Sequence, residues 1–132
     1  MQEDISEQEG RKLIETYIGT SSNLKDGLEP FPSSLRLLNW VKFLTKYNIY
    51  EEEINQFIHE DAYRLYCRPE YHLLGNHLLE NGFGLYFAAT YLNDEQLYQR
   101  AKAILTSELE EQILADGAHF ELSTMYHQHM LF

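Results

Sequence analysis

Apolar residues along the chain recur mainly at intervals of three and four positions, which is the spacing of one face of an α-helix. The first such stretch ends near Thr20, and Ser6 and Glu9 at its start have the spacing of a capping box. The pattern therefore predicts a first helix from just after Ser6 to about Thr20. Its apolar face is formed by Leu13, Ile14, Tyr17 and Ile18.

Punctuating residues divide the rest of the chain into further helices. Gly27, Pro30 and Pro32 predict a loop over residues 21–32, after which Ser33 or Ser34 is expected to cap a second helix. A third helix should end near Arg68 because proline follows it. Asn93 and Asp94 are expected to cap a fifth helix, and Ser123 a sixth. The second to fifth helices are expected over about residues 34–47, 51–68, 74–91 and 95–114.

The fourth predicted helix is apolar nearly all round, which is typical of a helix buried on every side. The fifth carries Glu108, Glu110 and Glu111 on a side expected to face solvent. No stretch alternates apolar and polar residues for long enough to predict a sheet. The chain is therefore predicted to be one all-α domain of helical hairpins over residues 1–132, with the fourth and fifth helices packed as neighbours.

Composition excludes several classes of partner. Ten Lys and Arg against 21 Asp and Glu give a net charge of −11, which argues against nucleic acid because phosphate binding needs clustered cations. No apolar run approaches the roughly 20 residues of a membrane span, so no membrane partner is expected. The acidic first residues contain no signal peptide. Aromatic residues make up 14% of the chain, which fits both carbohydrate contact and ordinary helix packing.

The first candidate site is a set of polar residues at the start of the buried fourth helix. Residues 77, 80, 81, 84 and 88 share one face, which begins with His77, Glu80 and Asn81 and continues with Gly84 and Ala88. Small residues there are expected to leave room beside the face. Unpaired burial of such polar groups costs about 1–3 kcal/mol each. Two interpretations stay open: a ligand site, or an internal network in which Glu80 accepts a hydrogen bond from His77.

The second candidate site is the segment 116–127, expected to be a loop leading into a helix. It places His119, Glu121, Tyr126 and His127 together, and loops of this kind often hold catalytic groups. A tyrosine can transfer protons when a neighbouring cation or amide lowers its pKa. Packing and surface roles for the same residues stay open.

Two other kinds of site are weaker hypotheses. A metal could be drawn from His77, His119, Glu121, His127 and His129, but His127 and His129 would point about 200° apart on a helix and no paired-Cys or HExxH spacing is present. Cys67 stands alone, with no histidine arrangement to make it a nucleophile. No metal or other cofactor is expected.

Both candidate sites resemble segments of the heparinase II/III-like polysaccharide lyases, which include related alginate lyases. The resemblance covers residues 70–82 (EYHLLGNHLLENG) and 116–127 (DGAHFELSTMYH), with a third piece at residues 29–40 (EPFPSSLRLLNW). Two departures from the family pattern are Ala118, where glycine is usual, and Thr124, where proline is common.

The resemblance implies an incomplete (α/α) toroid, followed in the family by a β-sandwich domain that this chain lacks. It also implies β-elimination at a uronic acid in an acidic polysaccharide. Asn76 and His77 would neutralise the uronate carboxylate, and Tyr126 would transfer the proton. Glu80 would orient His77 or bind sugar. The remaining implied substrate contacts are His119 and Glu121.

The chain is expected to be a fragment of such a lyase, inactive by itself because an open half-toroid leaves the cleft unclosed. The expected partners are the remainder of the toroid and the β-sandwich domain of the full-length protein. A non-catalytic helical module that binds glycan or protein is a second hypothesis. A truncated remnant without a stable fold is a third.

Overall fold

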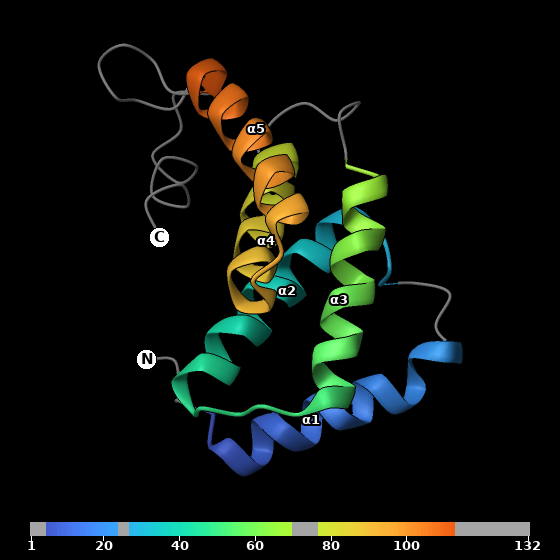
Figure 1. The fold of residues 1–132 in the computed structure, drawn as a ribbon. Helices are drawn as coiled ribbons and strands as arrows, with labels where there is room; N and C mark the ends of the chain where they lie inside the picture. Colours follow the sequence, from blue (N-terminus) through green and yellow to red (C-terminus); the bar gives the residue numbers. More distant parts are fainter. Residues whose placement is uncertain (1–4, 24–26, 70–76, 113–132) are drawn as a thin grey trace.

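The computed structural model describes residues 5–23, 27–69 and 77–112, and these ranges consist of α-helices joined by short connections (Figure 1). The all-α prediction is confirmed. The predicted helix after Ser123 lies outside the described residues. The helices are α1 (Glu7–Thr20), α2 (Pro30–Lys46), α3 (Glu52–Cys67), α4 (His77–Leu92) and α5 (Glu95–Gln112), and a 3₁₀ turn, η1 (Ser21–Asn23), follows α1.

Several helix ends lie where the sequence predicts them. The Ser6 hydroxyl accepts a hydrogen bond from the Glu9 amide at 3.3 Å, and the Glu9 carboxylate accepts one from the Ser6 amide at 3.2 Å, which completes the capping box. Helix α3 ends at Cys67, directly before the Arg68-Pro69 pair. Asp94 caps α5, since its carboxylate accepts the Leu97 amide at 3.0 Å.

The predicted start of the second helix is wrong by one turn. Helix α2 begins at Pro30, with Glu29 as its N-cap, so Ser33 and Ser34 lie inside the helix and are buried. Proline in a first turn costs no hydrogen bond because the first amides of a helix have no partner within it. Pro30 therefore opens the helix and does not break it.

Helix α4 is the centre of the packing and is confirmed as a mostly buried helix. It packs against α5 on one side and α2 on another, with α3 also in contact, and α4 and α5 run side by side as a hairpin in Figure 1. Two glycines permit the close approach. A Cβ on Gly82 would lie 2.9 Å from Leu105, and one on Gly84 would lie 2.8 Å from the Cα of Ser34. The core around α4 includes Leu37, Leu44, Ile58, Leu65, Leu85, Leu97 and Ile104.

Helix α1 crosses the base of the molecule beneath the start of α3 (Figure 1). Gly10 allows it to approach α2, because a Cβ there would overlap the Phe43 ring. Arg11 forms an ion pair with Glu51, and the Tyr47 hydroxyl donates to the Ile5 carbonyl at 2.9 Å. These contacts close the lower end of the bundle, away from the first turn of α2.

Candidate functional site

Two consecutive serines in α2 connect this helix to two different neighbours. The Ser33 hydroxyl donates to Asp61 Oδ1 on α3 at 3.0 Å. The Ser34 hydroxyl accepts from Asn81 Nδ2 on α4 at 2.9 Å and donates to the Pro30 carbonyl at 2.7 Å. Successive helix positions point about 100° apart, so adjacent serines suit adjacent faces. The first turns of α2 thus join the second half of α3 to the first two turns of α4.

Two of the predicted site residues lie at the start of α4. The His77 ring packs against the Phe31 ring of α2, with ring centres 4.5 Å apart and planes tilted by 31°. Glu80 lies one helical turn later and is 8% exposed. The structure therefore brings His77 and Glu80 together on α4. The other predicted site residues, Asn76, His119, Glu121 and Tyr126, lie outside the described residues.

The expectation of free space beside Gly84 is wrong. The backbone of Ser34 occupies that space, since a Cβ at Gly84 would meet the Ser34 Cα at 2.8 Å. Asn81, fully buried, uses its amide to bond the same serine. The internal-network interpretation therefore holds for Asn81, whose partner lies on α2. His77, at the first turn, is only half-buried.

A buried ion cluster joins α2 to α3, and the sequence pattern did not predict it. Arg36 donates through Nε to Asp61 Oδ2 and through Nη2 to Oδ1, both at 2.8 Å, which is a bidentate pair. Arg64 adds a bond from Nη1 to Oδ1 at 2.7 Å. Arg36 also donates through Nη1 to the Tyr17 hydroxyl and the Gly27 carbonyl, each at 2.7 Å. Burial is nearly complete: the side chains of Arg36 and Asp61 are 9% and 0% exposed.

A signal for this cluster is present in the sequence. Asp61 lies on the apolar face of α3, at helical spacing from Ile54, Ile58 and Leu65, all of which are buried. A carboxylate on such a face requires a buried cation or several donors. The spacing of α3 alone could therefore predict a partner for Asp61, but not that the partner is Arg36.

A cavity of ≈ 340 Å³ lies beside the first turn of α2 and the last turn of α3. Arg64 and Arg68 contribute its cationic groups. Glu29 also lines it, and its carboxylate accepts the Gly27 amide at 2.7 Å. Pro30 borders the cavity, whereas the next residue, Phe31, contacts His77. The cavity and His77 therefore flank the same turn of α2.

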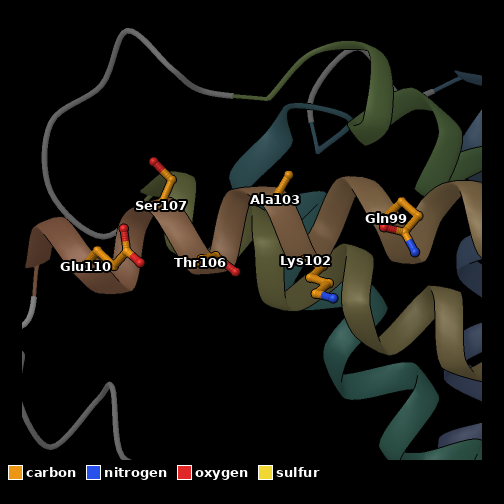
Figure 2. Close-up of a pocket in the computed structure, with 6 residues that line it drawn as sticks. All are labelled: Gln99, Lys102, Ala103, Thr106, Ser107 and Glu110. Atoms are coloured by element: carbon orange, nitrogen blue, oxygen red, sulfur yellow. The ribbon is translucent and has the colours of Figure 1, made fainter.

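Two other cavities lack a convergence of acid–base groups. One of ≈ 410 Å³ lies on the side of α5 opposite its buried residues Leu97 and Ala101. Figure 2 shows that all its labelled residues come from this one helix, so no second described element supplies a group across from them. Another, of ≈ 570 Å³ between α1 and α2, is lined largely by apolar residues. The turn shared by His77 and the arginines is the better candidate site.

In the described ranges, no group of three or more His, Cys, Asp or Glu side chains is placed to hold a metal ion. Of the histidines and carboxylates considered for a metal, His77 alone falls in these ranges. Over the same part of the chain, no helix combines the length and apolar character of a membrane span.

Comparison with known proteins gives one match. The family model described as Heparinase II/III N-terminus matches residues 33–132, a range that includes α3 to α5, all of α2 after its first three residues, and both candidate sites. No curated protein matches, and no solved structure matches. The match is independent of the fold geometry, and it covers both His77 and the buried Arg36–Asp61 pair.

Proposed function

The chain belongs to the heparinase II/III family, because residues 33–132 match the model of that family's N-terminus. From this membership we propose that the chain supplies part of the active site of a polysaccharide lyase. The substrate would be a uronic-acid-containing polysaccharide. The reaction would be β-elimination, in which the C5 proton and the O4 leaving group depart and a C4=C5 double bond forms. The 132-residue chain would form part of an (α/α) toroid and be inactive without the remaining catalytic groups.

The chemical difficulty is that a proton beside a carboxylate is weakly acidic. Donors fixed around that carboxylate stabilise the enolate-like charge that develops when the proton leaves. We assign this role to Asn76 and His77. Tyr126 would remove the C5 proton or protonate O4, and Glu80 would orient His77 or bind sugar. His119 and Glu121 would contact substrate from the segment 116–127, which also carries Tyr126.

The observation that carries the proposal is the position of His77. It lies at the first turn of α4, half-buried against Phe31, with Glu80 on the same face of the helix. A ring held on one side by an aromatic residue has a restricted orientation, which favours a fixed donor over a mobile one. Arg64 and Arg68 on the other side of the α2 turn add positive charge near a site that would receive an anionic sugar.

The direct test is an elimination assay. The 132-residue chain and a longer chain that continues past Phe132 are incubated with oligogalacturonate, alginate and heparan sulfate, and the ultraviolet absorbance of the C4=C5 bond is followed. The longer chain should produce this absorbance, and its Tyr126→Phe variant should lose turnover while keeping the same thermal melting curve. A longer chain that is inactive on every uronate polymer would contradict the proposal.

A second candidate is a helical module that binds glycan without cleaving it. The Asn81–Ser34 bond favours it, because this bond assigns one polar residue of the α4 face to packing. This alternative expects Asn76→Ala and His77→Ala to leave glycan binding unchanged. The lyase expects the same variants to lose turnover, so activity and affinity measured on the same samples separate the two.

A further inference from the structure

We propose that the cavity between the first turn of α2 and the last turn of α3 binds an oxyanion, a carboxylate or sulfate ester, on a sugar next to the one held at His77. Arg64 and Arg68 would supply the donors. This proposal rests on the proposed function, since that function provides the acidic polymer. It goes further by naming a second subsite and the residues that select the ligand's charge.

The distribution of charge supports an anion site here. The chain carries a net charge of −11, yet three of its five arginines, Arg36, Arg64 and Arg68, gather at the junction of α2 and α3. With Asp61 and Glu29 included, the local sum is 3 − 2 = +1. A positive junction on an acidic chain is where an anionic ligand would bind.

The hydrogen bonds among the described residues leave the two cavity arginines with N–H donors to spare. Arg36 already binds both oxygens of Asp61, so Arg64 is a second cation on a carboxylate that is paired. The Arg64 side chain remains 33% exposed. Arg68 is exposed and follows the end of α3. Arginine offers five N–H donors in a planar fork that matches carboxylate and sulfate oxygens.

The cavity has a size and position suited to one unit of a polymer. Its ≈ 340 Å³ lies near the lower end of the roughly 300–1,000 Å³ found for small-ligand sites. Pro30 lines the cavity, and the next residue of α2, Phe31, packs against His77. A glycan that crosses this turn of α2 would place one sugar at His77 and a neighbouring sugar beside the arginines.

The negative charge of Glu29 weakens anion binding at this site. Its carboxylate lines the cavity and accepts the Gly27 amide, so it holds the loop but repels an anion. Replacement by glutamine keeps an acceptor oxygen and removes the charge. Glu29→Gln should therefore strengthen anion binding while Arg68→Gln weakens it.

Binding of fluorescent oligosaccharides to the 132-residue chain tests the proposal. The probes are oligogalacturonate (carboxylate alone), heparan sulfate oligosaccharide (both groups), dextran sulfate (sulfate alone) and neutral dextran. Arg68→Gln should raise Kd about tenfold for the acidic probe that the chain prefers, as expected for loss of a charge-assisted hydrogen bond. Lys12→Gln on α1, an exposed cation that does not line the cavity, is the matched control and should change Kd less than about twofold.

A matched pair of acid variants completes the test. Glu29→Gln should lower Kd, whereas Glu15→Gln, at an exposed position of α1, should not. Preference among the acidic probes identifies the oxyanion. Equal effects of Arg68→Gln and Lys12→Gln, or equal binding of neutral dextran, would overturn the subsite.

The lyase proposal can fail separately. Binding that depends on Arg68 without elimination by the longer chain supports the subsite and contradicts the lyase. Elimination that is unaffected by Arg68→Gln at low substrate concentration supports the lyase and overturns the subsite.

Discussion

Asp61 shows how one residue can set the energetics of several helices. It is fully buried and accepts hydrogen bonds from Ser33, Arg36 and Arg64, all of them side-chain donors. Pairing of a buried charge offsets the cost of removing it from water, but this offset is lost as soon as one partner is removed. The cluster is therefore sensitive to single substitutions at Arg36 and Asp61, neither of which lines the cavity.

Asp61→Asn is expected to lower the free energy of unfolding by about 3–5 kcal/mol, because Arg36 would keep its charge in a buried position without a carboxylate. Urea unfolding followed by circular dichroism measures this change. The adjacent Glu60 is exposed and bonds only to its helix neighbour Gln56 among the described contacts, so Glu60→Gln should change stability by less than about 0.5 kcal/mol. Similar losses for both variants would contradict the role of Asp61.

Asp94 makes stability depend on acid pH. The amide of Leu97 and, to a lesser degree, the Tyr63 hydroxyl donate to its carboxylate and lower its pKa from the ordinary 3.8. The folded state therefore binds fewer protons than the unfolded chain near pH 3–4, so this contribution is complete above that range and is lost as the pH falls through the lowered pKa.

Asp94→Ala should cost about 1 kcal/mol at pH 7 through loss of the cap of α5. The difference in free energy of unfolding between the variant and the native protein should become smaller at pH 3, because the Asp94 carboxylate of the native protein is itself becoming protonated there. Unfolding curves at the two pH values measure it, with the exposed Glu110→Ala as a control. A difference that stays constant with pH would show that the cap acts without its charge.

At the scale of helices, sequence spacing predicted most of what the structure contains. The buried α4, the solvated side of α5, the α4–α5 hairpin and the ends of α1 and α3 follow from local patterns. The start of α2 did not follow, because Ser33 and Ser34 look like caps locally but are buried by contacts with α3 and α4. Those contacts depend on how helices pack, which spacing along one helix does not specify.

Gly84→Ala tests the α2–α4 packing. The added methyl would lie 2.8 Å from the Ser34 Cα, a backbone atom that cannot turn aside, so α2 and α4 must separate. Overpacking of this kind typically costs about 1–3 kcal/mol. In α1, Gly19 has no atom within 4 Å of the same methyl, and Gly19→Ala should stabilise the chain by up to about 1 kcal/mol through helix propensity. Thermal melts of the two variants should therefore shift in opposite directions.

At the scale of the whole molecule, the candidate site combines segments that are distant in the sequence. His77 and Glu80 could be proposed from α4 alone, since polar residues in an apolar helix are conspicuous. The arginine cavity could not, because residues near position 30 and near position 66 meet only after α2 and α3 pack. The pattern along one helix thus identifies polar residues in an otherwise apolar helix, but it does not identify sites that form between helices.

The net charge of −11 should make stability rise with ionic strength. Acidic residues gather near Glu7, Glu52 and Glu110, and most are exposed. Their mutual repulsion is screened as the Debye length falls from about 30 Å at 0.01 M salt to about 10 Å at 0.1 M. The buried Arg36–Asp61 pair is screened much less. Melting temperature should therefore increase with NaCl over this range, and a decrease would mean that exposed ion pairs outweigh the repulsion.

The bidentate pair also restricts how the gene can change. A substitution at position 61 alone strands the buried charge of Arg36, and one at position 36 removes the bidentate partner of Asp61, whereas two apolar residues of similar volume can replace such a pair at little cost. A library randomised at both codons and selected for folded protein should return the charged pair or an apolar pair, and few mixtures. The two positions would thus be inherited as a unit, although 25 residues separate them along the chain.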